Sequence, residues 1–192
     1  MQLVWPARSY LPGYVDALER GWSADNLRGE AAAREELQRI AADPDAFLAS
    51  LVDREGSGDP IVLADGSLVP RLPGYNRWIW DGEFCGRIGF RWQPGTEALP
   101  PHCLGHIGYS VVPWKRRRGY ATAALRETLR EFAKEGLRYA EITTDPDNIP
   151  SQRVIAANGG VLIEEFVKPA SLGGTPGLRY RVPLVEGGVR RV

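Results

Sequence analysis

Residues 105–122 read GHIGYSVVPWKRRRGYAT. The apolar and small residues at the start of this stretch predict a strand that ends at Pro113. Four consecutive cations follow, and Gly119 stands directly after the last of them. From Gly119 to Glu135, apolar side chains recur at the spacing of one helical face. These side chains are Ala121, Leu125, Leu129 and Phe132. The stretch therefore predicts a strand, a basic turn and a helix.

This arrangement is suited to binding phosphate. The first turn of a helix exposes unpaired N–H groups and a partial positive charge. Hydrogen bonds to a charged group contribute about 1.5–3 kcal/mol each, more than the roughly 0.3–1 kcal/mol of the helix dipole. Gly119 lets the backbone approach an anion closely, and Ala121 is small for the same reason. The alternative is a solvated basic turn before an ordinary amphipathic helix.

The rest of the chain reads as helices followed by mostly strands. We expect helices over residues 14–20, 27–40, 44–52 and 148–158. We expect strands over residues 77–80, 84–92, 139–144, 161–167 and 178–185. The two strands 77–80 and 84–92 flank Asp81-Gly82-Glu83, which is a hairpin signal. A second helix start, Asp147-Asn148-Ile149-Pro150, follows the strand 139–144.

Composition argues against several classes of partner. The formal net charge of the 192 residues is zero, so no global field attracts nucleic acid or an anionic membrane. No apolar run approaches the roughly 20 residues of a spanning helix, and the N-terminus lacks the regions of a signal peptide. The two cysteines, Cys85 and Cys103, suggest no disulfide framework. We expect a cytoplasmic protein without a nucleic-acid or membrane partner.

The motifs resemble those of the GNAT acetyltransferases. The segment Arg116–Ala121 is similar to the family's R/Q-x-x-G-x-G/A signature, and the preceding strand ends Val111-Val112-Pro113 as the family's fourth strand does. The segments Gly105–Tyr109 and Asp147–Ser151 resemble a bacterial subgroup of predicted acetyltransferases. The likeness covers about residues 75–185 well and the N-terminal helical part, about residues 9–55, weakly.

The resemblance implies a fold and a cofactor. The fold would be α/β, GNAT-like, with a central twisted mixed sheet of about six or seven strands flanked by helices, in one domain over residues 1–192. The cofactor would be acetyl-CoA. Backbone groups of Val111 and Val112 would pair with its pantetheine arm. The pyrophosphate would lie on residues of the turn and helix start, namely Arg116, Arg117, Arg118, Gly119, Tyr120, Ala121 and Thr122.

The resemblance also implies roles near the thioester. Asn148 and Ser151 would face the pantetheine or thioester end, although both residue types also cap helices. His106 occupies the position where many relatives carry a glutamate base. Deprotonating a lysine-like amine at pH 7 costs roughly 4.6 kcal/mol, and an imidazole can accept that proton. The alternative is a structural histidine on a strand.

A proton donor for the leaving thiolate is less evident. The family's usual tyrosine would fall at Ile155 in this chain. The acid is therefore absent, or it is replaced by Ser151, Tyr109 or water. Since an alkyl thiol has a pKa of about 8.5, loss of the acid would cost only about 2 kcal/mol at pH 7.

Two functions remain open at this stage. The first is an N-acetyltransferase that moves an acetyl group from acetyl-CoA to a primary amine of a small molecule or peptide. The second is a non-catalytic acyl-CoA sensor with the same fold. A nucleotide-binding enzyme would need G-x-x-x-x-G-K-[ST] or G-x-G-x-x-G, which the sequence lacks. No ligand cluster completes a metal site around His102, Cys103 and His106. Both a monomer and a homodimer are compatible with the sequence.

Overall fold

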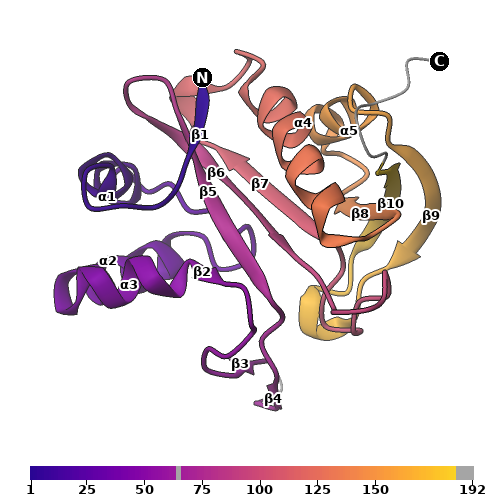
Figure 1. The fold of residues 1–192 in the computed structure, drawn as a ribbon, viewed down its shortest axis with the longest axis horizontal. Helices are drawn as coiled ribbons and strands as arrows, with labels where there is room; N and C mark the ends of the chain where they lie inside the picture. Colours follow the sequence, from indigo (N-terminus) through magenta and orange to yellow (C-terminus); the bar gives the residue numbers. More distant parts are fainter. Residues whose placement is uncertain (64–65, 185–192) are drawn as a thin grey trace.

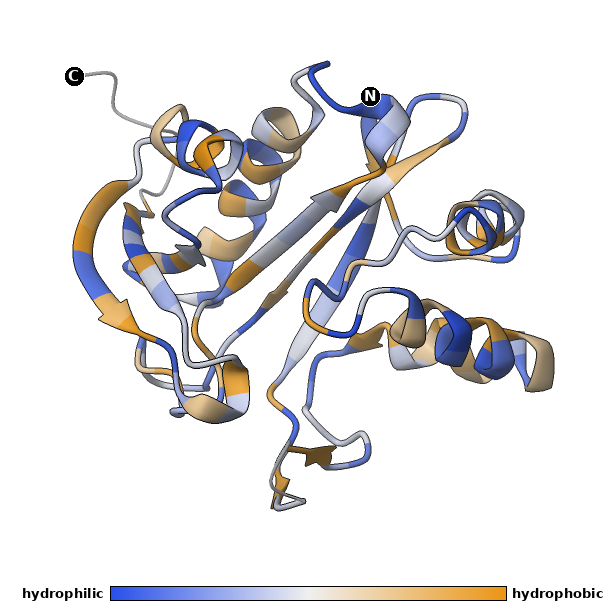
Figure 2. Cartoon of the chain, turned by 180° about the vertical axis from the view of Figure 1, so that it is seen from behind, coloured by the Kyte–Doolittle hydropathy of each residue, from blue (hydrophilic) through white to orange (hydrophobic). Residues whose placement is uncertain are grey.

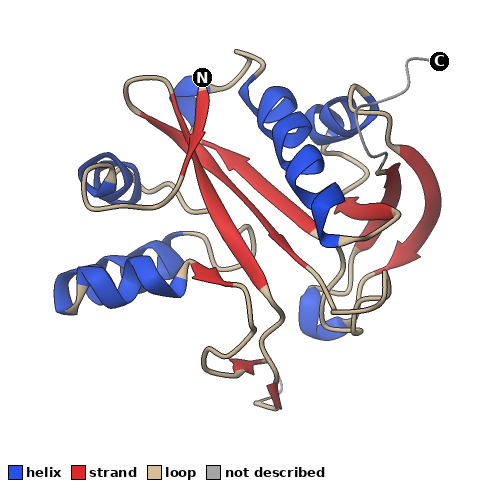
Figure 3. Cartoon of the chain, in the orientation of Figure 1, coloured by secondary structure: helices blue, strands red, loops and turns tan. Residues whose placement is uncertain are grey.

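The computed structural model describes residues 1–63 and 66–184 and places two groups of helices on a divided β-sheet (Figures 1 and 3). The helices are α1 (Leu11–Glu19), α2 (Glu30–Ala42), α3 (Pro44–Ser50), α4 (Tyr120–Phe132) and α5 (Ile149–Ala156). The strands are β1 (Gln2–Val4), β2 (Val52–Asp53), β3 (Ile61–Val62), β4 (Leu68–Val69), β5 (Gly74–Trp80), β6 (Phe84–Arg91), β7 (Ile107–Val111), β8 (Tyr139–Thr144), β9 (Val161–Val167) and β10 (Pro176–Pro183).

The sheet has two parts. The five-stranded part has the order β1-β5-β6-β7, with β2 also paired to β5, and the three-stranded part has the order β8-β10-β9. Every paired strand runs antiparallel to its neighbour, but the crossover through α4 makes β8 parallel to β7. The expected α/β fold is confirmed, with more strands than expected. Of the expected strand 178–185, Val185 lies outside the described residues.

The two helix groups cover opposite faces of the sheet. Helix α4 buries Leu125, Leu129 and Phe132 against the central strands, as their spacing predicts. Ala121, the fourth residue of that expected face, lines a cleft instead. Helices α1 to α3 form a second core with the other face of the sheet. Both groups alternate hydrophobic and hydrophilic segments along their length, as amphipathic helices do (Figure 2).

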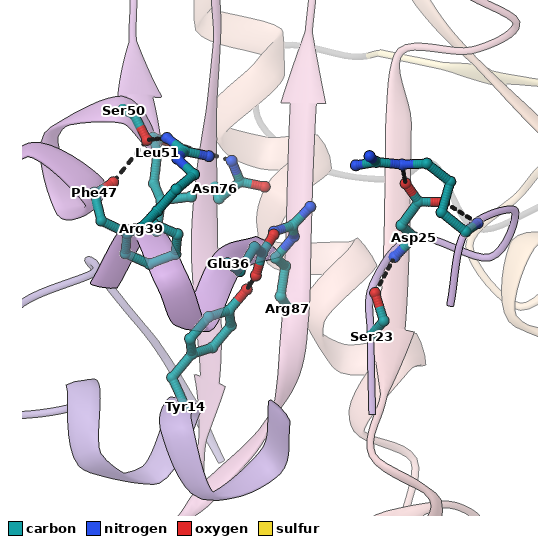
Figure 4. Close-up of polar contacts among 11 residues, drawn as sticks. Tyr14, Ser23, Asp25, Glu36, Arg39, Phe47, Ser50, Leu51, Asn76 and Arg87 are labelled. Carbon is teal, nitrogen blue, oxygen red and sulfur yellow. Dashed lines mark hydrogen bonds and ion pairs between the residues drawn. The ribbon is translucent and has the colours of Figure 1, made fainter. Parts of the chain in front are cut away.

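A polar network fixes α2 against the face of the sheet that α1 to α3 cover (Figure 4). The Tyr14 hydroxyl, on α1, donates a hydrogen bond to Glu36 on α2. Arg87 of β6 approaches both groups from the sheet, with 3.4 Å between its guanidinium and each of them. The Tyr14 ring stacks on Trp78 at a centroid distance of 4.7 Å, and it has no solvent exposure. The network therefore joins three elements through groups that water reaches poorly.

His106 lies where β7 and β8 meet. Its backbone N–H donates to the Glu141 carbonyl over 2.7 Å, and its Nδ1 accepts the Glu141 N–H over 3.0 Å. The His106 carbonyl accepts instead from Arg91 of β6, over 2.9 Å. The imidazole thus accepts the β8 N–H that a backbone carbonyl would accept in a regular sheet. This pair of bonds joins β7 to β8 where the two strands meet. His106 has no solvent exposure, and this burial lowers its pKa to about 4.

This burial makes the stability of the fold depend on pH. The folded chain holds a neutral imidazole, whereas the unfolded chain binds a proton once the pH falls below the ordinary pKa of 6.5. Because the unfolded state then carries more protons, stability falls between pH 6.5 and about 4, by up to about 3 kcal/mol. Urea unfolding at several pH values should show this slope in the wild type. His106→Gln should remove that part of it, and equal slopes in both proteins would contradict the assignment.

Candidate functional site

A cleft of about 1060 Å³ opens where β7 and β8 diverge. One wall is β7 with the turn and helix start that follow it, and the other is the end of β8 with the start of α5. The loop between β6 and β7 closes one end, and residues between α1 and α2 reach the cleft from the opposite face of the sheet. Residues from both faces of the sheet therefore line this cleft.

The start of α4 presents free N–H groups to this cleft. The first backbone hydrogen bond of the helix runs from Ala123 to the Gly119 carbonyl, and no side chain caps the helix. Tyr120, Ala121 and Thr122 line the cleft, and their N–H groups precede that first bond. By contrast, α3 and α5 are capped by Asp43 and Asn148. An uncapped helix start is a ready anion site.

The backbone before α4 curls in an unusual way. Arg117 has a φ of +61°, and it is the one non-glycine residue with positive φ in the described chain. Gly119 has a φ of +76°, and a Cβ there would meet nothing within 4 Å. Gly119 is therefore needed for its backbone conformation and leaves the approach to the helix open.

The hairpin between β5 and β6 anchors this turn. Asp81 accepts from Lys115 over 3.0 Å and from the Tyr120 hydroxyl over 2.5 Å. The tyrosine's hydrogen bond and the lysine hold the pKa of Asp81 well below its usual range. Lys115 is also paired with Glu83, so this cation is engaged within the protein. Arg116 and Arg117 line the cleft, whereas Arg118 does not.

Only alternate residues of β7 offer backbone groups to the cleft. The Val112 N–H donates to Cys85 of β6, and its carbonyl accepts from Lys115. The structure therefore does not bring Val112 to the cleft as the sequence suggested. In an antiparallel pair the hydrogen bonds alternate, so the groups of Tyr109 and Val111 point away from β6, toward β8. The Val111 carbonyl accepts from the Arg116 side chain over 3.2 Å.

At the start of α5, Asn148 and Ser151 differ in their contacts: the first caps the helix, and the second directs its hydroxyl toward Tyr109. Asn148 is the helix cap, since its Oδ1 accepts the Ser151 N–H over 3.1 Å. The Ser151 hydroxyl lies 2.9 Å from the Tyr109 hydroxyl, which reaches across the cleft from β7. Burial raises the pKa of Tyr109 to about 12, so this phenol stays protonated at neutral pH. Both residues line the cleft, as does Asn148.

His106, the base suggested by the sequence, is placed behind the cleft. It is fully buried and does not line the cleft. Its Nδ1 accepts a backbone hydrogen bond, so the ring hydrogen sits on Nε2, which has no partner within the described chain. With its lone pair engaged and its pKa lowered to about 4 by burial, the imidazole has no free site for a proton at neutral pH.

Several cleft residues carry no local sequence signal. Arg91 ends β6, His102 lies in the following loop, and Leu27 comes from the segment before α2. Asp145, the one carboxylate that lines the cleft, is ion-paired with Lys168. These residues are far apart along the chain, and only the fold brings them together. The described residues contain no group of His, Cys, Asp and Glu side chains that could hold a metal ion.

Comparison with known proteins places this geometry in a family. The family model described as "Acetyltransferase (GNAT) domain" matches residues 29–161. No curated protein matches the chain. No helix in the ranges 1–63 and 66–184 is long and apolar enough to cross a membrane.

Solved structures share the fold at low sequence identity. The microcin C7 self-immunity acetyltransferase MccE, in complex with acetyl-CoA and AMP, is 14% identical with a TM-score of 0.62, over 94% of this chain and 91% of that one. RimL, a ribosomal L7/L12 α-N-protein acetyltransferase in complex with coenzyme A, is 15% identical with a TM-score of 0.62, over 96% and 94%. Mycobacterium smegmatis RimJ, in complex with CoA-disulfide, is 19% identical with a TM-score of 0.58, over 93% and 79%. The chain belongs to the GNAT acetyltransferase family, whose members are acetyl-CoA-dependent transferases.

Proposed function

We propose that this enzyme transfers an acetyl group from acetyl-CoA to the primary amine of a peptide or small molecule, and that the α-amine is the preferred kind. The observation that carries the proposal is the uncapped start of α4 beside the free edge of β7, on one continuous cleft. Phosphates and an extended amide chain are the groups that such a pair of features recognises. Acetyl-CoA carries both.

The donor would lie along β7. Its pyrophosphate would accept hydrogen bonds from the N–H groups of Tyr120, Ala121 and Thr122, with Arg116 and Arg117 adding positive charge. Its pantetheine amides would pair with the N–H of Val111, as an added strand does, while the Val111 carbonyl stays with Arg116. The N–H of Tyr109, farther into the cleft, is then placed to polarise the thioester carbonyl.

Ser151 would protonate the departing thiolate. The amine nitrogen attacks the thioester carbonyl and the C–S bond breaks. The leaving sulfur takes the hydroxyl proton of Ser151, and the serine oxygen regains a proton from the acetylated nitrogen. When Tyr109 donates its hydrogen to the Ser151 oxygen, the serine hydrogen is free to point into the cleft. The tyrosine then stabilises the negative charge that develops on the serine oxygen. This arrangement supplies an acid where the family's usual tyrosine is replaced by Ile155.

The engagement of His106 and of the two nearby carboxylates supports an acceptor of low amine pKa. His106 is buried, Glu141 is held by Arg179 and Arg181 at 3.1 and 2.7 Å, and Asp145 is paired with Lys168. With neither His106 nor a carboxylate as the base, we expect the amine to lose its proton to water before attack. That loss costs about 1 kcal/mol at pH 7 for an α-amine but roughly 4.6 kcal/mol for a lysine amine. The chemistry therefore favours an amino terminus.

Thiol release from acetyl-CoA tests the function. We expect release to depend on an added amine, to be faster for peptide α-amines than for lysine side chains, and to rise with pH until the acceptor amine is deprotonated. Peptides with a blocked amino terminus and a free lysine provide the matched control. Binding of acetyl-CoA without release by any amine would instead identify an acyl-CoA sensor.

Substitution at Gly119 tests the pyrophosphate site. Asparagine and aspartate both tolerate positive φ and have nearly the same shape, so Gly119→Asn and Gly119→Asp differ chiefly in charge. Acetyl-CoA should raise the melting temperature of the wild type and of Gly119→Asn. It should stabilise Gly119→Asp far less, because the carboxylate repels the phosphates. If both variants fold and respond alike, the pyrophosphate lies elsewhere.

Ser151→Ala tests the proton donor. We expect kcat to fall by about 10- to 100-fold, with the Kd for acetyl-CoA nearly unchanged. Tyr109→Phe should give a smaller loss, since it removes only the support of the serine. Ser9→Ala, at an exposed position outside the cleft, is the control. A wild-type kcat in Ser151→Ala would leave water as the donor.

A further inference from the structure

Arg91 places a cation at the end of the cleft away from the helix start. It is the last residue of β6, and its backbone N–H bonds to the His106 carbonyl beside the junction of β7 and β8. Its side chain is exposed and lines the cleft. One guanidinium nitrogen lies 3.6 Å from the place where a Cβ on Gly108 would stand. The guanidinium therefore lies over Gly108, where the absence of a side chain leaves room beside it.

This guanidinium has no partner of its own. No hydrogen bond, ion pair or ring contact engages the Arg91 side chain within residues 1–63 and 66–184. The carboxylates of this region are engaged with other cations, since Glu141 is held by Arg179 and Arg181 and Asp145 by Lys168. A cation that lines a cleft without a partner is available to an anionic ligand.

A second polar group of the same cleft is also unsatisfied. His102, in the loop after β6, lines the cleft, and its Nε2 is a buried atom with no hydrogen-bond partner. Buried polar atoms normally have partners, so this nitrogen is available to a polar ligand. Arg91 ends β6 and His102 lies in the loop that leads from β6 to β7, and both residues line the cleft.

Arg91 lies away from the turn that is proposed to bind the CoA pyrophosphate. The pyrophosphate turn follows the end of β7, whereas Arg91 pairs with His106, at its beginning. The guanidinium lies over Gly108, and the three residue steps from Gly108 to Val111 span about 10 Å of strand. Arg91 therefore lies near the reacting end of the cleft, on the side from which the acceptor would arrive.

We propose that the acceptor amine carries a carboxylate close to it, and that Arg91 binds this carboxylate with His102 beside it. The inference rests on the proposed acetyl transfer and names its substrate class. The charges of the cleft support it, because Asp145 is the one carboxylate that lines the described cleft and it is already paired. A polyamine would meet a bare guanidinium and no free carboxylate. An amino-terminal peptide with an acidic residue at position one or two fits both the α-amine preference and the cation.

Paired acceptor peptides test this inference. Tripeptide amides that carry Asp or Asn at the first position, and a second pair with this change at the second position, differ by one carboxylate at constant size. In the wild type, kcat/KM should favour the Asp peptide of at least one pair by about 10- to 100-fold. Arg91→Gln should bring that ratio close to one, and Arg91→Lys should retain part of it. The KM for acetyl-CoA should be the same in all three proteins.

The controls distinguish a failure of the carboxylate inference from a failure of the proposed acetyl transfer. Arg126→Gln removes an exposed cation of α4 outside the cleft and should leave the Asp/Asn ratio as in the wild type. Equal acetylation of Asp and Asn peptides would overturn the inference and leave acetyl transfer intact, as would a preference that survives in Arg91→Gln. If no peptide is acetylated, calorimetric titration of the CoA-bound protein with the same peptides measures whether the Asp peptide binds more tightly than the Asn peptide. A carboxylate preference that Arg91→Gln abolishes supports the inference, and equal binding overturns it.

Discussion

The site depends on two parallel strands that share hydrogen bonds at one end and then separate. The join is made by His106, which donates its N–H to the Glu141 carbonyl and accepts the N–H of the same residue on its imidazole. Beyond this point, the edge of β7 has no strand beside it, and its polar groups face a cleft. A backbone edge of this kind is normally paired or hydrated, because an unsatisfied peptide group is costly. An extended amide chain is the kind of ligand that pairs with such an edge.

The same principle operates at the start of α4. Helices α3 and α5 satisfy their first N–H groups with the side chains of Asp43 and Asn148, whereas α4 has glycine at the capping position. The chain thus leaves polar groups free at two adjacent places, and both open on one cleft. Asp81 keeps the intervening turn in place through Lys115 and Tyr120, so the free groups are held rigidly. Fixed donors bind an anion without the cost of reorganisation.

Local sequence predicted the turn and its helix well, because a glycine after arginines and an apolar repeat are local signals. It predicted β8 and β9 to the residue for the same reason. It missed β1, whose three residues become a strand only by pairing with β5. It assigned both Val111 and Val112 to the cofactor, because only the alternation of hydrogen bonds with β6 separates the two residues. Arg91 and His102 were missed because the fold alone brings them into the cleft.

His106 shows how one residue type can carry two opposite roles. At the surface of a cleft, an imidazole accepts protons near neutral pH, which is why its place on the strand suggested a base. In this structure the ring is fully buried, with its acceptor nitrogen engaged and its pKa lowered to about 4 by burial. Its contribution is therefore geometric: it ends the pairing of β7 with β8 and so opens the cleft. Since neither His106 nor a carboxylate of the cleft is free to take the proton, the proposed preference for an acceptor of low amine pKa follows from how the sheet is split.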